Sequence, residues 1–210
     1  MDFSGFTNDD FDVFLIDGLE ARMEALKTTI RPKLEKLGAY FAPTLSSLTG
    51  DEMFVHVAKH ARRTINPPKD TWVAFAANPR GYKMMPHFQI GLWHTHLFIW
   101  FAVIYEAPDK EVMAERFIKK AAKIYKDTPK EYSWSLDHTK PETIKHQQLS
   151  KADLLTQFER LKTVKKAELL CGYTIDREMV MELGGTGLLT QIEEVFHKVS
   201  PLYKMALNIK

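Results

Sequence analysis

Histidine and tryptophan side chains are concentrated in one apolar stretch of the sequence, HFQIGLWHTHLFIW, at residues 87–100. His94 and His96 are two residues apart, a spacing that places both imidazoles on one face of a continuous strand, where they could bind a metal ion. An unbroken strand over residues 87–105 is longer than the strands of most globular proteins, however. We therefore expect a hairpin turn at residues 93–96, and this turn weakens the argument for a shared metal ion.

A second histidine pair, His56 and His60, lies in the segment MFVHVAKHARR at residues 53–63. Apolar residues four and three apart predict a helix here, and Thr49 with Glu52 forms a capping-box pattern that starts such a helix. Histidines four apart share one side of a helix, but valine follows His56, so the HExxH pattern of zinc peptidases is absent. The sequence therefore predicts no metal site.

Basic side chains gather on the polar side of this predicted helix and in the loop at residues 78–87. Arginine binds carboxylate and phosphate groups through two parallel hydrogen bonds, so the sequence predicts a small anionic ligand at this surface. His60 is the candidate for an acid/base residue, if the protein is an enzyme. The alternative is a solvated helix surface without a ligand. The predicted ligand-binding residues are His56, Lys59, His60, Arg62, Arg63, Arg80, Lys83 and His87.

The charge of the chain is unevenly distributed, although its formal net charge is only +2. Residues 53–105 contain six lysine and arginine residues and one acidic residue, Asp70, whereas residues 1–52 contain five basic and ten acidic residues. A locally positive surface attracts anions. The same distribution also fits an acidic first quarter that packs against the basic middle and neutralises it.

Two further functions remain open from the sequence, and neither requires catalysis. Trp72, Tyr82, Phe88 and Trp93 alternate with basic residues, a pattern that suits stacking on single-stranded nucleic acid. The chain lacks helix-turn-helix, zinc-finger and RNP motifs, so nucleic acid is the less favoured ligand. A non-enzymatic interaction protein is the other alternative, and the sequence identifies no cofactor and no oligomeric state.

The chain contains a single cysteine, Cys171, so it has no internal disulfide and no cysteine-rich zinc site. Ser133, Ser135, Asp137 and His138 are of the types found in a catalytic triad, but sequence neighbours rarely adopt triad geometry. No apolar run reaches the length of a membrane span. The acidic N-terminal sequence lacks the basic start of a signal peptide, so we expect a cytoplasmic protein.

Hydrophobic periodicity predicts an α+β fold, as one domain over residues 1–210. Apolar residues spaced by four and three from Leu19 to Leu48 predict a long helix that is kinked at Pro32 and Pro43. Short loops between neighbouring strands favour a mostly antiparallel sheet with helices packed against it. Strands are predicted at residues 71–77, 87–93, 97–105, 132–136 and 167–174, and further helices at 109–126, 151–162 and 188–198.

Four segments of the chain also resemble one protein family. They are DVFLIDGLEARMEALK at 12–27, MFVHVAKHARRTINPPKDTWVAFA at 53–76, PHFQIGLW at 86–93 and VKKAELLCG at 164–172. Together they resemble the YktB-like family of uncharacterised proteins from Gram-positive bacilli, and the resemblance covers nearly the whole chain. It implies a cytosolic α+β domain, and it carries over no activity and no site residues.

Overall fold

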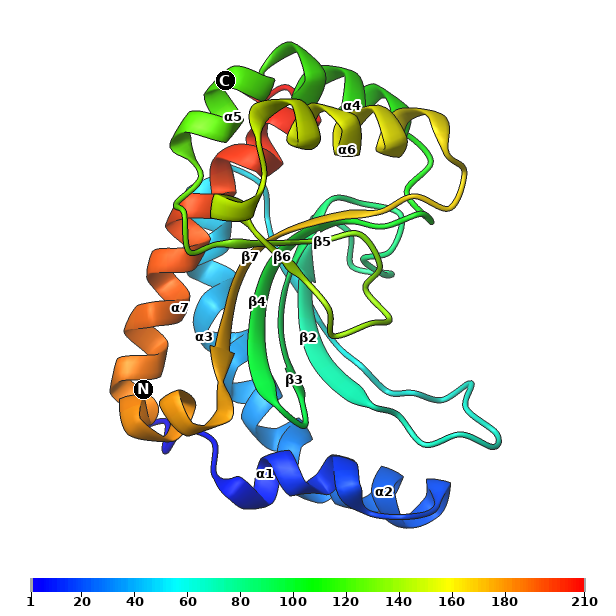
Figure 1. Cartoon of the computed structure of the whole chain (residues 1–210). Helices are drawn as coiled ribbons and strands as arrows, with labels where there is room; N and C mark the ends of the chain where they lie inside the picture. Colours follow the sequence, from blue (N-terminus) through cyan, green and yellow to red (C-terminus); the bar gives the residue numbers. More distant parts are fainter. Residues whose placement is uncertain (1, 210) are drawn as a thin grey trace.

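A computed structural model describes residues 2–209 of the chain (Figure 1). A seven-stranded sheet with the order β1-β2-β3-β4-β7-β5-β6 runs through the molecule. Every pair of neighbouring strands is antiparallel, which confirms the predicted α+β class with an antiparallel sheet. The strands are β1 (Phe54–Val57), β2 (Asp70–Ala76), β3 (His87–Trp93), β4 (His96–Val103), β5 (Ser133–Ser135), β6 (Ile144–Lys145) and β7 (Leu169–Asp176).

The predicted hairpin turn is present. Strands β3 and β4 pair from Leu92 with Leu97 to His87 with Ala102, and His94 and Thr95 form the connection. This confirms that residues 87–105 do not form one strand. Strand β4 is buried along its full length, as expected from its apolar residues on both sides.

Helices surround one side and both ends of the sheet. In Figure 1, α3 and α7 lie behind the sheet on the left, α4, α5 and α6 lie at the top, and α1 and α2 lie at the bottom. Among the described residues, none of the helices combines the length and apolar character needed to cross a membrane. The helices are α1 (Asn8–Asp12), η1 (Val13–Leu15), α2 (Leu19–Ala25), η2 (Leu26–Ile30), α3 (Arg31–Thr49), α4 (Lys110–Lys119), α5 (Ala121–Asp127), η3 (His146–Gln148), α6 (Lys151–Thr163) and α7 (Arg177–Leu207).

The long N-terminal helix extends from α2 through the π-helical turn η2 into α3. Pro32 occupies the first turn of α3, where a missing N–H costs no hydrogen bond, and Pro43 lies inside the helix. The predicted kink at these prolines is not confirmed. The helix ends where Gly50 adopts a left-handed conformation with φ 84°, a common helix stop.

Helix α7 is longer than the predicted 188–198 helix, and Gly184 interrupts its helical dihedral angles with φ 59° and ψ −173°. A Cβ atom on the next residue, Gly185, would lie 1.6 Å from the carbonyl oxygen of Phe3. These glycines therefore allow the N-terminal segment to pass close against the start of α7.

The two sides of the sheet carry different side chains, because residues alternate along each strand. Leu97, Ile99, Phe101 and Val103 of β4 belong to the large hydrophobic core that includes residues of α3 and α7. We call this side the helix-covered face. It is built almost entirely from aliphatic side chains and phenylalanine.

The alternate residues form the opposite side, which we call the loop-covered face. Phe98 and Trp100 of β4 point here, together with His87, Gln89 and Trp93 of β3, by their register. The loops at residues 58–69, 77–86 and 136–143 cover this face. Its small hydrophobic cluster consists of Trp93, Phe98, Trp100, Ala102, Ile104 and Leu170, with Trp72 packed against it.

The helix predicted at residues 53–63 is wrong. Residues 54–57 form the edge strand β1, and residues 58–69 form a loop. Thr49 closes α3 instead of capping a new helix, because its hydroxyl donates to the Leu45 carbonyl. The residues Phe-Val-His-Val fit strand alternation as well as helix spacing, and pairing with β2 decides between them.

Candidate functional site

A cleft opens on the loop-covered face, between the sheet and the 136–143 loop that connects β5 with β6. Its empty space is about 280 Å³, open solvent included. Aromatic side chains of β3 and β4 form one wall, and polar side chains of the loop form the other. The lining residues are Gln89, Trp93, His96, Phe98, Trp100, Ser135, His138, Lys140, Pro141, Thr143 and Leu170.

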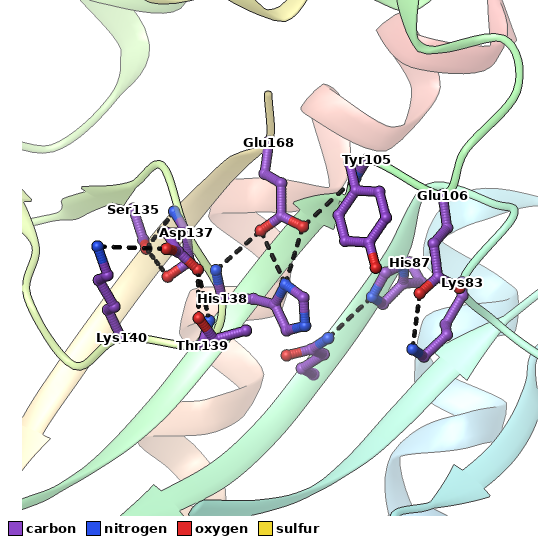
Figure 2. Close-up of polar contacts among 11 residues, drawn as sticks. Lys83, His87, Tyr105, Glu106, Ser135, Asp137, His138, Thr139, Lys140 and Glu168 are labelled. Carbon is purple, nitrogen blue, oxygen red and sulfur yellow. Dashed lines mark hydrogen bonds and ion pairs between the residues drawn. The ribbon is translucent and has the colours of Figure 1, made fainter. Parts of the chain in front are cut away.

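His138 projects from the 136–143 loop and is held by Glu168. The Nδ1 atom of His138 lies 2.9 and 2.8 Å from the two carboxylate oxygens, and the backbone N–H of His138 donates to Oε2 at 2.8 Å. Figure 2 shows the imidazole below Glu168 and on the same side of the sheet as His87. Because Nδ1 is engaged, the Nε2 edge is the part of the ring that is left for a ligand.

The pKa of His138 is raised above its usual value. Burial lowers it, but the hydrogen bond and the negative charge of Glu168 outweigh burial. A histidine bound through Nδ1 to a buried carboxylate favours the imidazolium form, which donates a proton at Nε2. The raised pKa therefore favours a protonated His138 as a donor on the loop side of the cleft.

Asp137, His138 and Glu168 are also close enough to be considered for a metal ion, with ligand atoms within 4.8 Å of one another. The carboxylate oxygens of this group already accept hydrogen bonds within the protein. Glu168 accepts from His138 and from the backbone N–H of Tyr105, and Oδ1 of Asp137 accepts from the hydroxyl and N–H of Thr139. A protonated His138 would also repel a cation, and the contacts present are hydrogen bonds between His138, Glu168 and their neighbours.

A chain of polar contacts runs across the upper part of the loop-covered face. Nδ1 of His87 lies 2.8 Å from the Met85 carbonyl oxygen, and Nε2 lies 2.9 Å from the side-chain nitrogen of Gln89. The ring of Tyr82 packs against His87 with centroids 4.8 Å apart, and its hydroxyl accepts from Trp72. These contacts fix the residues beside the cleft in one arrangement.

Asp70 adds a buried carboxyl group at the start of β2, opposite Trp93 of β3. Burial raises the pKa of Asp70 to about 6, although His138, Arg63 and a backbone hydrogen bond lower it. A carboxylate that is buried without a close cation destabilises the folded protein at neutral pH. A buried polar group that costs stability is more common at functional sites than in cores that serve packing alone.

The structure separates the histidines that the sequence placed on one helix. His56 lies on β1 and contacts the Asn78 carbonyl at 2.9 Å, near the ring of Tyr82. His60 lies in the 58–69 loop with φ 50°, contacts the hydroxyl of Thr71 and packs edge-on against Trp72. Burial, with smaller contributions from Arg63 and Arg31, lowers the pKa of His60 to about 4, so it is neutral at pH 7.

The predicted basic residues lie in the loops at residues 58–69 and 77–86 and not on a helix. Lys59, Arg62 and Arg63 are exposed in the 58–69 loop, and Nη1 of Arg63 donates to the Asn66 carbonyl. Arg80 is exposed in the next loop, and Lys83 pairs with Glu106 at 2.8 Å. His87 is buried and lies beside the cleft through Gln89. Ligand binding by these residues stays a prediction.

Several side chains that line the cleft, among them Trp93, His96 and His138, were candidates from the sequence, but the sequence did not bring them together into one site. Glu168 had one signal, a single acidic residue at the start of the apolar segment AELLCGY. For Trp100 and Gln89, the available signal was the alternation of side chains along each strand, which places both residues on the same side of the sheet as His87. His138 was considered with Asp137, its neighbour in sequence, whereas its partner lies 30 residues further along the chain.

The other predicted reactive residues are engaged in packing. His94 contacts the Phe11 carbonyl at 3.1 Å, and His96 lines the cleft with Nδ1 against the Thr95 hydroxyl. Neither belongs to a group of potential metal ligands in residues 2–209. Cys171 is buried in β7, and burial raises the pKa of its thiol, which makes it a poor nucleophile.

Comparison with known proteins gives a consistent result. Residues 6–203 match the family described as "Domain of unknown function (DUF1054)". A UPF0637 protein of Bacillus velezensis is 55% identical over 204 residues, covering 97% of each chain, and one of Bacillus licheniformis is 52% identical with the same coverage. A UPF0637 protein of Bacillus cytotoxicus is 52% identical over 95% of this chain and 96% of its own. These matches confirm the expected family of uncharacterised bacillus proteins.

Proposed function

We propose that this chain, which belongs to the DUF1054 family, binds a small, flat, negatively charged molecule in the cleft of the loop-covered face. One observation carries the proposal. The lining of the cleft combines three aromatic side chains with His138 and Lys140, and it includes no aspartate or glutamate. Ligand sites typically pair an apolar wall with a few oriented polar groups in this way.

The aromatic wall and the cations have separate roles. Trp93, Phe98 and Trp100 offer ring surfaces for a flat molecule, and the rings of Phe98 and Trp100 are themselves nearly parallel, with an interplanar angle of 23°. The imidazolium of His138 supplies a charged hydrogen-bond donor toward an anionic group. Lys140 is more exposed and adds a longer-range attraction.

The proposed ligand is anionic, as expected from the sequence, but its main contacts are in the cleft and not at residues 56–63. The sequence predicted the ligand at a basic helix face over residues 56–63 and at the 78–87 loop, but residues 54–57 form β1 and residues 58–69 form a loop. His87 is the member of the predicted set that stands beside the cleft, through its contact with Gln89. The cytoplasmic location expected from the sequence stays a prediction.

A larger pocket, with about 470 Å³ of empty space, lies between α5 and α7, but it supports a ligand less well. Its lining is mainly apolar, from Ile124, Tyr132 and Leu202 among others. Of the two lysines there, Lys123 is paired with Asp127. Its lining has no counterpart of the His138–Glu168 pair, so we favour the cleft.

The test uses the whole chain and a panel of probes that differ in charge and shape. Benzoate, hydroxybenzoates, indole carboxylates and nucleoside monophosphates are compared with benzamide and with acetate. We expect flat anions to shift the indole NMR signals of Trp93 and Trp100 and to raise the melting temperature, because binding to the folded state stabilises it. Uncharged benzamide should bind at least about tenfold more weakly than benzoate, about 1.4 kcal/mol of binding free energy.

Two results would overturn the proposal. In the first, no flat anion at millimolar concentration perturbs the two tryptophan signals. In the second, single-stranded oligonucleotides bind while mononucleotides do not, which would favour the nucleic-acid alternative. Replacement of His138 by phenylalanine provides the matched variant. It should abolish the preference for benzoate over benzamide, whereas replacement of the exposed His197 should leave that preference unchanged.

A further inference from the structure

The amide group of Gln89 stands between a buried histidine and the cleft. Gln89 is only 4% exposed, and it lines the cleft beside Trp93 and Trp100. Its side-chain nitrogen and oxygen would make opposite demands on a ligand, since the nitrogen donates and the oxygen accepts. The orientation of this amide therefore determines whether Gln89 offers a donor or an acceptor to the cleft.

The contacts of His87 fix that orientation. Nδ1 of His87 lies 2.8 Å from the Met85 carbonyl oxygen, which can only accept, so Nδ1 must carry the proton. In a neutral imidazole the other nitrogen, Nε2, is then an acceptor. Gln89, whose amide lies 2.9 Å from Nε2, must consequently turn its NH₂ group toward His87.

The opposite end of the amide follows from this assignment. With the NH₂ group engaged, the carbonyl oxygen Oε1 is directed away from His87, no side chain or backbone group of residues 2–209 donates to it, and it is not among the fully buried atoms without a partner. An amide oxygen that reaches the cleft without a protein donor accepts from a ligand or from water. His138 lies in the same cleft and supplies the complementary donor.

We infer that the ligand carries two different polar groups on its flat part, an anionic group that binds His138 and a hydroxyl or N–H group that donates to Oε1 of Gln89. Hydroxylated or amino-substituted aromatic acids belong to this chemical class. The inference rests on the proposed binding of a flat anion and makes it more specific. His87 acts as a positioning residue, because it fixes the amide and does not touch the ligand.

The environment of His87 keeps its ring neutral. Burial lowers the pKa of His87 to about 4, although its bond to Met85 raises it, and the nearby His138, His56 and Lys83 lower it further. An imidazolium at this position would have to donate from Nε2 and would reverse the amide. At neutral pH the carbonyl oxygen of Gln89 therefore remains on the cleft side.

The first test measures the histidine without any ligand. Long-range proton–nitrogen NMR spectra of the whole chain, with His87 assigned by comparison with His87→Phe, distinguish a protonated Nδ1 from a protonated Nε2. We expect the Nδ1–H tautomer between pH 6 and pH 8. The Nε2–H tautomer would overturn the inference, because Nε2 would then donate to the amide oxygen and the NH₂ group would face the cleft.

The second test compares ligands that differ in one hydrogen-bond donor. The 2-, 3- and 4-hydroxybenzoates are titrated beside their methyl ethers, which keep the charge and the oxygen but lose the donor. We expect one hydroxybenzoate to bind at least tenfold more tightly than its ether. In Gln89→Met, which keeps the length of the side chain without the oxygen, the two should bind equally, while the exposed Gln147→Met should behave as wild type.

The outcomes separate the two claims. Equal binding of every hydroxybenzoate and its ether to the wild-type protein would overturn this inference and leave the binding of flat anions intact. Absence of binding by the whole series and by the other flat anions would overturn the proposed function. If Gln89→Met does not fold, the tautomer of His87 and the wild-type comparison of acid and ether still decide the question.

Discussion

The two faces of the sheet use the same strands for different purposes. On the helix-covered face, β4 contributes Leu97, Ile99, Phe101 and Val103 to one continuous core. On the loop-covered face, the residues between them meet histidines, a glutamine and tryptophans. Both faces are buried, so exclusion of water does not explain the difference.

The two faces carry different side chains because helices cover one of them and loops cover the other. Helices satisfy their own backbone groups and present apolar surfaces, so they pack well against aliphatic side chains. Loops expose backbone donors and acceptors, which need polar partners when they are buried. The Met85, Asn78 and His138 backbone groups find such partners on the loop-covered face. A polar face under loops is also where binding residues usually occur.

The largest effect is expected on the helix-covered face. Phe101→Ala should lower the free energy of unfolding by about 3–5 kcal/mol, because it leaves a cavity in the core. Thr143→Ala in the cleft should change it by less than about 0.5 kcal/mol. Chemical denaturation measures both values. Similar losses in the two variants would contradict the assignment of stability to the helix-covered face.

Asp70→Asn should stabilise the protein at neutral and alkaline pH, by up to about 3 kcal/mol. Burial raises the folded-state pKa of Asp70 from its ordinary value of 3.8 to about 6. The favourable contribution of Asp70 is therefore complete below pH 3.8 and lost as pH rises through 6.

Denaturation of wild type and Asp70→Asn at pH 4 and pH 8 tests whether the stability difference between them grows with pH. The two proteins should differ at pH 8 and converge toward pH 4. An Asp70→Asn protein that is less stable than wild type at pH 8 would mean that Asp70 is paired as a carboxylate, and the loop-covered face would then not carry a stability cost there.

Glu168→Gln should lower the pKa of His138, because the neutral amide no longer stabilises the imidazolium. The same change should cost about 1–3 kcal/mol of stability, since buried N–H donors lose a charged acceptor. An NMR titration of the His138 ring measures the pKa, and Glu159→Gln on the exposed side of α6 is the control. An unchanged His138 pKa would contradict the conclusion that the charge of Glu168 stabilises the imidazolium form.

The smallest effect is expected for Lys140→Ala. Lys140 is exposed and its distance to Asp137 is 3.6 Å, so its removal should weaken binding of a flat anion about two- to fivefold, by less than about 1 kcal/mol. Calorimetric titration at low and high salt measures it, and the difference should shrink at high salt. Lys126→Ala on α5 is the matched control. A complete loss of binding would make Lys140, and not His138, the principal contact.

Much of the fold follows from local sequence patterns. Alternation in β3, the apolar run of β4 and the turn between them predicted the hairpin, and periodicity predicted α3 and α6. The edge strand β1 was missed because four residues fit helix spacing and strand alternation equally well. Such short segments are decided by their partners, here β2 and the close approach of Val55 to Gly38 of α3.

The sequence alone determined the alternation along β3 and β4, and with it the separation of a hydrophobic face from a face rich in tryptophan and histidine. This separation is local, because successive side chains on a strand point to opposite sides. Only the tertiary structure decided that His138 pairs with Glu168, that Gln89 is oriented by His87, and that both line one cleft with Trp100. Those contacts join separate strands and loops, whose meeting depends on the packing of the whole sheet rather than on any spacing in the chain.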